Sequence, residues 1–330
     1  MDGNYTVVGD PHLTPKTLDK GDQLFKIVEE LGNPVIWLGD LQDTKEVVRS
    51  KVLNAYFDYF KSSKLQHIIL VGNHDWHNLE CLDHSLKTLG ALPNVIIVDK
   101  PIMFDSFMAI PYYKDTDKLK QILKEVGGVR TLFCHVDISG FDYGNGCLCE
   151  DGLSLEDFKT FGLVISGHFH KHQVQNNLVY LGTPFSHSFG ETDQHKFLGI
   201  YNETSNTLKF LPSKFPRHVT LKLRISPPAG SVSYFEDLHK FIEANKDNLM
   251  RIQLYGNPAD VASFDRVPYN KLNIKFEDKS EGDDIIGADI DETLDNKTQF
   301  NIWAKDVRQL DPETINIGLS ILEALSVKRN

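Results

Sequence analysis

Residues that can bind metal ions follow five apolar segments of this chain. The segments at 6–8, 35–38, 67–71, 131–134 and 163–166 are each followed within a few positions by Asp, Asn or His. The candidate ligands at these places are Asp10, His12, Asp40, Asn73, His135, His168 and His170. Carboxylate, amide and imidazole ligands together suit manganese, iron or zinc better than calcium or a thiophilic ion. The pattern therefore predicts a site for two divalent metal ions.

Two cations at such a site favour hydrolysis of a phosphate ester. A carboxylate such as Asp40 can bridge two cations that lie roughly 3.5 to 4 Å apart. A hydroxide held between them would attack phosphorus in line, while both cations neutralise the charge that develops on the phosphate oxygens. We therefore expect a phosphoesterase mechanism that depends on two metal ions.

Three further polar residues border the candidate ligands. His74 follows Asn73, and we expect it to face the phosphate and protonate the leaving oxygen as a general acid. Asp75 is expected to orient His74 rather than to bind metal. The position of Asp43 fits either a residue on the phosphate side or the cap of a loop.

Each motif taken alone also has an ordinary structural explanation. A single Asp-x-His pair is typical of a solvated turn. The Gly-Asn-His-Asp sequence at 72–75 and the Gly-His-Phe-His sequence at 167–170 are more specific, yet either can occur without metal. Five motifs in this order, each at the end of an apolar segment, favour a metal site.

The elements that must position these residues alternate between strand and helix. Aliphatic and β-branched runs bounded by glycine predict buried strands, and in open α/β sheets ligands bind beyond the carboxyl ends of the strands. Apolar residues at helical spacing predict helices over 18–31, about 47–60, about 115–126 and, as a shorter element, 82–89.

Beyond His170 the alternation gives way to short strands and tight turns. Residues 173–180 and 198–211 each predict a hairpin. Two sheets packed face to face, with helices outside, would accommodate both halves. We therefore expect an α/β fold, an αββα sandwich of two sheets, over residues 1–215.

Two smaller parts are predicted after the sandwich. Residues 216–280 contain strand patterns and one helical pattern, over about 234–244, and predict a small α+β domain. Residues 281–330 begin with an acidic stretch and end in an apolar helical segment, for which Asp311-Pro312 is a suitable start. We expect an acidic linker followed by terminal helices.

Composition excludes few partners. The 330 residues carry a net charge of −11, but nine acidic residues and one lysine lie between Glu277 and Asp295, which leaves −3 for the remaining chain. The overall sign therefore does not exclude nucleic acid.

No apolar run approaches the roughly 20 residues needed to cross a bilayer. The amino terminus lacks the pattern of a secretory signal, and the four cysteines are irregularly spaced, so we expect reduced thiols in a cytoplasm.

The motifs together resemble those of the calcineurin-like metallophosphoesterases, over about residues 5–215. The motifs that carry the resemblance are Asp10-Pro11-His12, Gly39-Asp40-Leu41-Gln42-Asp43, Gly72-Asn73-His74-Asp75, His135 and Gly167-His168-Phe169-His170. Within that superfamily, residues 166–173, 180–184 and 189–191 are similar to the SbcD-type DNA repair nucleases, which include phage-encoded subunits of recombination endonucleases.

The resemblance implies a DNA exonuclease and endonuclease that uses two manganese ions. It further implies a capping domain after the nuclease domain, and terminal helices that dock on the coiled coil of an SbcC-type ATPase. A phage protein of this kind would act in the cytoplasm of the infected bacterium, and a homodimer is left open. Many cellular members have histidine at the position of Asp43, a residue associated with handling DNA ends, so we infer no strand preference or processivity from those relatives.

Two other functions are compatible with parts of the pattern. One is a phosphatase or a small-molecule phosphodiesterase of the same fold. Protein phosphatases of the superfamily have arginine and glycine after the aspartate that corresponds to Asp43, whereas Thr44-Lys45 follows here. The other is an inactive scaffold that binds DNA ends or the ATPase, against which the complete set of ligands argues.

Overall fold

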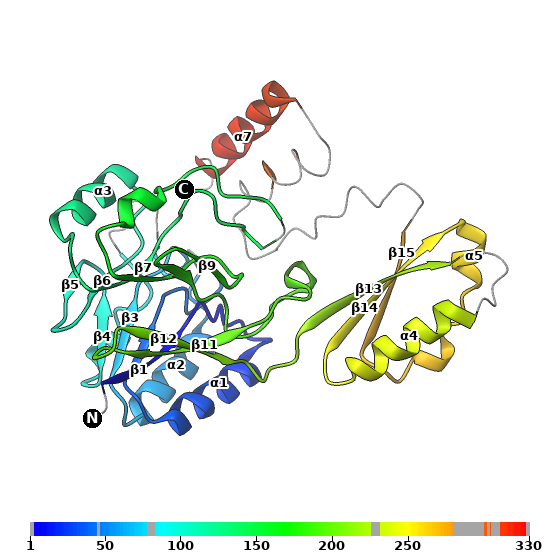
Figure 1. Cartoon of the computed structure of the whole chain (residues 1–330), viewed down its shortest axis with the longest axis horizontal. Helices are drawn as coiled ribbons and strands as arrows, with labels where there is room; N and C mark the ends of the chain where they lie inside the picture. The colour runs from blue at the N-terminus through cyan, green and yellow to red at the C-terminus, as the bar shows by residue number, and fades with distance from the viewer. Residues whose placement is uncertain are drawn as a thin grey trace. The chain divides into compact units, whose positions relative to one another are not determined.

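The computed structural model describes residues 3–44, 47–77, 83–144, 146–225, 232–279, 300–301, 304 and 311–327. The chain divides into two compact units. The first comprises Met1–Phe185 and His195–Phe215, and the second comprises Ser186–Gln194 and Pro216–Asn330 (Figure 1). Each unit is described by itself below.

The first sheet of the first unit contains four parallel strands and an antiparallel hairpin. Its spatial order is β12 (Thr207–Pro212), β11 (Phe197–Asn202), β1 (Asn4–Val8), β2 (Val35–Trp37), β3 (His67–Leu70) and β4 (Val95–Val98). Helices α1 (Leu18–Leu31) and α2 (Ser50–Ser62) form the crossovers from β1 to β2 and from β2 to β3. The carboxyl ends of β1, β2 and β3 therefore lie at one edge of the sheet.

The second sheet has a parallel centre and antiparallel edges. Its order is β5 (Ile102–Met103), β6 (Met108–Ile110), β7 (Thr131–His135), β8 (Leu163–Gly167), β10 (Leu178–Tyr180) and β9 (Gln173–Gln175). Helix α3 (Thr116–Glu125) connects β6 to β7, and a single 3₁₀ turn, η2 (Leu155–Phe158), precedes β8. The predicted hairpins are present as β9–β10 and β11–β12.

Alternating side chains build three apolar layers in this unit. On β2, Val35 and Trp37 pack with the helices α1 and α2, whereas Ile36 faces the second sheet. On β7, Phe133 faces the first sheet, and Leu132 packs with α3. The layers run helix, sheet, sheet, helix, as Figure 1 shows, and the predicted αββα fold class is confirmed.

Two helix predictions needed correction. The helix expected from about residue 47 begins at Ser50. Among the described residues of the segment expected to be helical at 82–89, 83–88 form a bridge and turns, and Leu89–Ala91 form one 3₁₀ turn, η1. Pro93 explains why η1 ends at Ala91, because it forces the preceding residue out of the helical region, and Leu92 has ψ of 135°.

The second unit contains a parallel three-stranded sheet in the order β13 (His218–Ile225), β14 (Leu249–Gly256) and β15 (Ile274–Lys279). Its other elements are η3 (Phe189–Glu191), α4 (Val232–Ala244), α5 (Pro258–Ser263), η4 (Val267–Tyr269) and α7 (Pro312–Val327). The predicted acidic linker falls within residues 280–299, which lie outside the described part of the chain. No helix in the described part of the chain is long and apolar enough to span a membrane.

Candidate metal centre

All seven predicted ligands lie where strands of the first unit end. They follow β1 (Asp10 and His12), β2 (Asp40), β3 (Asn73) and β8 (His168 and His170), or end β7 (His135). The edges of the two sheets meet here. The backbone N–H of His168 donates to Asp10 Oδ2 at 3.0 Å, and His135 Nε2 lies 3.4 Å from Asp40 Oδ2. The predicted convergence of these side chains is therefore present in the structure.

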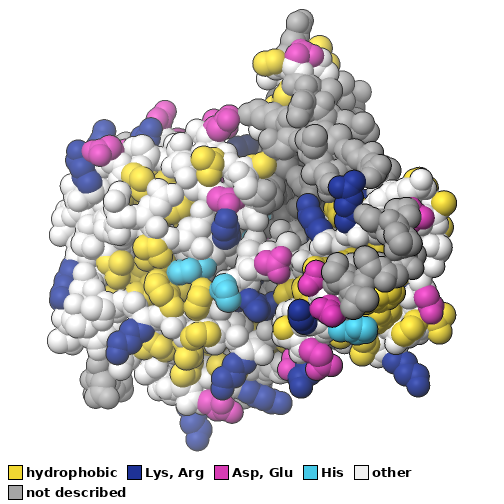
Figure 2. Space-filling view, turned by 45° about the vertical axis from the view of Figure 1, so that its right-hand side comes forward, with side chains coloured by type: hydrophobic (Ala, Val, Ile, Leu, Met, Phe, Trp, Pro, Cys, Tyr) yellow, Lys and Arg dark blue, Asp and Glu magenta, His cyan; other side chains and the backbone are white. Residues whose placement is uncertain are grey.

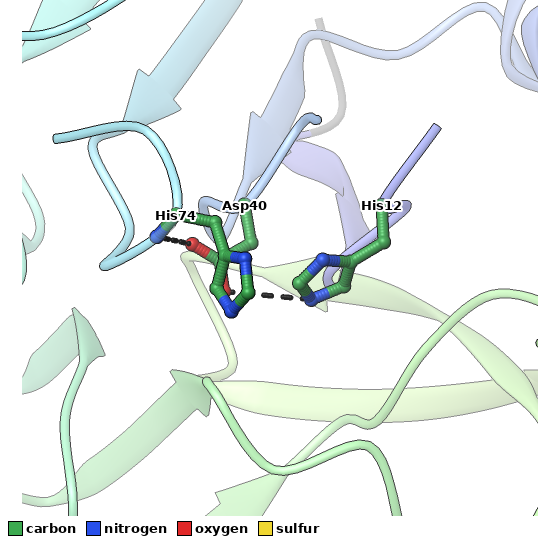
Figure 3. Close-up of side chains that lie close together, drawn as sticks. All are labelled: His12, Asp40 and His74. Atoms are coloured by element: carbon green, nitrogen blue, oxygen red, sulfur yellow. Dashed lines mark hydrogen bonds and ion pairs between the residues drawn. The ribbon is translucent and has the colours of Figure 1, made fainter. Parts of the chain in front are cut away.

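Asp40 occupies the centre of the cluster. Its Oδ2 lies 3.4 Å from Nε2 of His12 and 3.4 Å from Nε2 of His135. Two groups of side chains have ligand atoms within 4.8 Å of one another: His12 with Asp40 and His74, and Asp40 with His135 and His168. Figure 3 shows the first of these groups. Because Asp40 belongs to both groups, it has the position that a bridging carboxylate requires.

In the second group, atoms that carry lone pairs face one another. Nε2 of His135 lies 2.8 Å from Asn73 Oδ1, and Nδ1 of His168 lies 2.9 Å from the same oxygen. The two imidazole nitrogens are 3.3 Å apart. The opposite nitrogen of His135, Nδ1, lies 2.8 Å from the carbonyl oxygen of Leu38. A carbonyl only accepts, so Nδ1 carries a proton, and in the neutral ring, the form that binds a cation, the lone pair is on Nε2 and faces the group.

The other side of Asp40 is built from the same kind of atoms. Nε2 of His12 lies 3.1 Å from Nε2 of His170, with both side chains buried. Asp10 is fully buried, and its Oδ1 accepts no hydrogen bond from the described residues. His135 Nδ1 lies 3.4 Å from that oxygen. Thus a buried carboxylate oxygen and two imidazoles converge here.

The donor set fits divalent cations. Buried carboxylates, imidazole nitrogens and an amide oxygen approach one another with few protons to share between them, which costs free energy unless a cation is bound among them. Cys134, Cys147 and Cys149, the cysteines in the described part of the chain, form no disulfide there and take no part in these groups. The set suits manganese, iron or zinc, as the sequence predicted.

Electrostatics also favour positive charge at this place. Burial acts to raise the pKa of Asp40, but His135, His74 and His12 outweigh it and hold the pKa well below its usual value. Burial raises the pKa of Asp10, and its histidine neighbours offset this only in part. Burial would lower the pKa of His135, yet Asp40 and Asp10 raise it to about 9. The carboxylates therefore stabilise whatever cation lies beside them.

Three glycines allow the ligands to approach so closely. A Cβ atom on Gly72 would lie 2.2 Å from Asp40 Oδ1, and one on Gly39 would lie 2.7 Å from His135 Nδ1. At Gly167 the nearest atom would be Asp10 Oδ1, at 2.6 Å. These contacts are far below van der Waals distance, so only glycine fits at these strand ends.

Three of the candidate ligands have left-handed backbone conformations. The φ values are 42° for His12, 51° for Asp40 and 94° for His168. Residues other than glycine adopt such angles at a cost of about 1–3 kcal/mol, and they concentrate at functional sites. The surrounding hydrogen bonds and packing hold these three residues in place, which is typical of a pre-organised binding site.

His74 borders the group around His12. Its backbone N–H donates to Asp40 Oδ1 at 2.7 Å (Figure 3). Its Nδ1 lies 2.6 Å from the carbonyl oxygen of Asp43. The ring meets that of His12 edge-on, with centroids 4.7 Å apart. Asp43 itself is partly exposed, and its Oδ1 lies 3.9 Å from His12 Nδ1. Both residues therefore line the site.

Asp75 holds backbone rather than the ring of His74. Its carboxylate accepts hydrogen bonds from the N–H groups of Asp40, Leu41 and Gly72 at 2.8, 3.2 and 2.9 Å. Burial and the nearby Asp40 raise the pKa of Asp75 to about 8, although the N–H groups of Gly72 and Asp40 and the ring of His135 act to lower it. The residue fixes the loops after β2 and β3 to each other, and so positions Asp40 instead of His74.

Two residues of the site were not predicted. Asp137 Oδ1 lies 2.6 Å from His168 Nε2, and the ring of Tyr112 stacks near that of His168, with centroids 6.0 Å apart. The available signals were weak. Asp137 stands two positions after His135, and Tyr112 follows a strand that Pro111 ends.

Comparisons with known proteins agree with this geometry. Residues 3–172 match the model of the calcineurin-like phosphoesterase family. Exonuclease subunit 1 of Enterobacteria phage T4 is 27% identical over 248 residues, which cover 69% of this chain and 72% of that protein. Putative phosphoesterase 244L of Invertebrate iridescent virus 6 is 28% identical over 220 residues, which cover 59% of this chain and 75% of that protein.

Proposed function

Because the chain belongs to the calcineurin-like phosphoesterase family, we propose that it is a metal-dependent DNA exonuclease and endonuclease. It would act as the nuclease subunit of an SbcCD-like complex of recombination and repair, encoded by a phage. The observation that carries this proposal is the place of Asp40 between two groups of ligand atoms. The relative named exonuclease subunit 1 supports a nucleic acid as the substrate, for which we propose DNA.

We propose that the seven candidate ligands divide between two cations, both manganese, on the two sides of Asp40. His74, which belongs to the first group of side chains, is left out because we propose another role for it. One cation would be held by Asp10, His12, Asp40 and His170, and the other by Asp40, Asn73, His135 and His168. When bound, the pair would supply Lewis-acid activation of water and of the phosphate. The chain contributes the fixed, water-poor surroundings, since most of these side chains are buried.

His74 is proposed to be the general acid. Its Nδ1 is engaged with the carbonyl oxygen of Asp43, which sets the plane of the ring and leaves Nε2 as the atom that can deliver a proton. The ring is half-buried, so a phosphate oxygen can reach it. Protonation of the leaving oxygen at this atom would let the sugar hydroxyl depart.

Turnover of three substrates tests the proposal. Linear duplex DNA, a phosphopeptide and a cyclic nucleotide are each incubated with the manganese-loaded protein, with Asp40→Asn as the inactive control. We expect cleavage of DNA to exceed hydrolysis of the other two. Failure to cut DNA, with and without the ATPase subunit, would refute the nuclease assignment.

A phosphatase or small-molecule phosphodiesterase is the second candidate. The viral relative with 28% identity is named only as a phosphoesterase, which favours a wider choice of substrate. Hydrolysis of the phosphopeptide or the cyclic nucleotide in preference to DNA would establish this alternative. An inactive scaffold would hydrolyse none of the three substrates.

The partner is proposed to be an SbcC-type coiled-coil ATPase. On α7, Ile315 is buried but Ile317 is 56% exposed, an apolar residue available to a second protein. On the face seen in Figure 2, Lys and Arg side chains are interspersed with Asp and Glu. Because phosphate contacts come mainly from Lys and Arg, we propose that the ATPase supplies part of the DNA-binding surface.

A further inference from the structure

The ring of His168 has different partners on its two nitrogen atoms. Nδ1 faces the candidate metal group, 2.9 Å from Asn73 Oδ1 and 3.3 Å from His135 Nε2. Nε2 faces away and lies 2.6 Å from Oδ1 of Asp137, whose side chain is 35% exposed. One imidazole thus links a carboxylate to the site.

The carboxylate decides which nitrogen carries the proton. An ionised carboxylate only accepts hydrogen bonds, so Nε2–H of His168 donates to Asp137. A neutral imidazole then has its lone pair on Nδ1, the atom that points at Asn73 and His135. A carboxylate on the distal nitrogen also makes the ring a more basic ligand and fixes its rotation.

Backbone contacts keep Asp137 in place independently of its carboxylate. Its carbonyl oxygen accepts from the N–H of Leu153 at 3.0 Å, and Ile138 forms a bridge with Leu153. A Cβ atom on Gly152 would lie 2.6 Å from the same carbonyl oxygen, so the two segments are tightly packed. Removing the side-chain carboxylate should therefore leave this part of the fold intact.

We propose that Asp137 is a positioning residue, which selects the metal-binding tautomer of His168 and thereby sets the affinity of the cation held with Asn73 and His135. The inference rests on the proposed function only in requiring that this site binds a cation. For His135 the same task falls to the backbone carbonyl of Leu38, which substitution cannot remove. Of these two hydrogen-bond acceptors, only the carboxylate of Asp137 can be removed by substitution.

Manganese binding to the full chain tests the proposal directly. Titration calorimetry and electron paramagnetic resonance would be applied to the wild type, Asp137→Ala and Asp137→Asn. In Asp137→Ala we expect one of two manganese ions to bind about 10- to 100-fold more weakly, while the other keeps its affinity. Asp137→Asn should lose less, because its amide oxygen can still accept from Nε2–H. Excess manganese should restore turnover of a small phosphodiester by Asp137→Ala.

Asp151→Asn is the matched control, since it removes an exposed carboxylate from the same stretch of chain. Its manganese affinity should equal that of the wild type, and thermal unfolding would show that all variants are folded. Unchanged manganese affinity in folded Asp137→Ala, or an equal loss in Asp151→Asn, would overturn the proposal. A wild type that binds two manganese ions but cuts no DNA would refute the nuclease function and leave the role of Asp137 standing.

Discussion

The ring orientation of two histidines of the site is fixed by the hydrogen-bond partner of the nitrogen that faces away from the site. The carbonyl of Leu38 holds Nδ1 of His135, and the carboxylate of Asp137 holds Nε2 of His168. Each contact directs the opposite nitrogen to the same oxygen, Oδ1 of Asn73. The ligand geometry is therefore largely formed by the protein itself, and a cation need not reorganise it.

Replacement of His74 shows whether this residue acts as a general acid or as a metal ligand. In His74→Ala we expect turnover of DNA to fall on the order of 100- to 10,000-fold, because the leaving oxygen loses its proton donor. Manganese affinity, measured by calorimetry, should stay at the wild-type value. A variant that loses manganese would show that His74 is a ligand, as its place beside His12 and Asp40 also allows.

The buried His67 predicts a loss of stability on acidification. It lies between Trp37 Nε1, which donates to its Nδ1 at 3.3 Å, and Ser63 Oγ, 2.9 Å from its Nε2. Burial lowers its pKa from 6.5 to about 4. The unfolded state takes up this proton first, so stability present above pH 6.5 is lost as the pH falls towards 4. The loss attributable to His67 should reach about 2 kcal/mol at pH 5.

Urea unfolding at pH 7 and pH 5 measures this effect. His67→Gln can keep hydrogen bonds to both neighbours and does not titrate in this range. Its free energy of unfolding should therefore change less between the two pH values than that of the wild type. An identical pH dependence in both proteins would contradict the assignment.

The sequence allowed the convergence of the candidate ligands to be predicted, but not the contacts that position them; their binding of metal stays a prediction. Asp, Asn and His after apolar runs are recognisable from residue type and place alone. The contacts of Leu38, Asp75 and Asp137 depend on ring rotation and on backbone atoms of other loops. Residue type does not reveal such contacts, so the sequence pattern links Asp75 to the neighbouring His74 and not to the backbone of Asp40.

At the scale of elements, the strand ends are packed so closely that three positions have no room for a Cβ atom. Gly39, Gly72 and Gly167 each end or follow a strand and lie against a ligand of another strand or loop. The strands must stay close for Asp40 to reach both ligand groups. The glycines thus connect the packing of the sheets to the geometry of the site.

Gly72→Ala tests this connection. Its Cβ would lie 2.2 Å from Oδ1 and 2.5 Å from the backbone nitrogen of Asp40, so the loop after β2 must move. We expect manganese affinity to fall by about 10- to 100-fold, as for other residues that position ligands. Gly127→Ala is the control, because its nearest atom is 3.3 Å away on Thr160. Equal affinities in both variants would show that the loop tolerates the displacement.

The long periodic helices were predictable, and the short helix expected at 82–89 was not. The 14 residues of α1 carry buried side chains at helical spacing and end at Gly32, whose φ of 69° suits glycine. In the segment expected to be helical at 82–89, local pattern competed with Pro93 and with the turns that lead into β4. Tertiary context decides such short segments, and the sequence pattern does not contain it.

At the scale of the whole molecule, the fold class of the first unit is confirmed, whereas the roles proposed for the second unit stay predictions. The sandwich holds all the candidate ligands, and its fold class followed from the order of strands and helices. The capping role of the sheet β13–β14–β15 and the docking role of α7 stay predictions. The predicted boundary at residue 281 falls among residues outside the described part.

A charge placed on α7 tests the docking prediction. In Ile317→Asp we expect affinity for the coiled-coil ATPase to weaken by at least about 1 kcal/mol, roughly fivefold, because a charge would be buried at the interface. Manganese-dependent hydrolysis of a small phosphodiester should be unchanged. Asn316→Asp adds the same charge at a neighbouring exposed position and should bind normally. Normal binding by Ile317→Asp would place the interface elsewhere.

The convergence of ligands on two cations is tested most directly by anomalous scattering from a manganese-soaked crystal. We predict two peaks that share Asp40, one within bonding distance of His12 and His170 and the other of Asn73, His135 and His168. A single peak, or two peaks that do not share Asp40, would contradict the two-metal account.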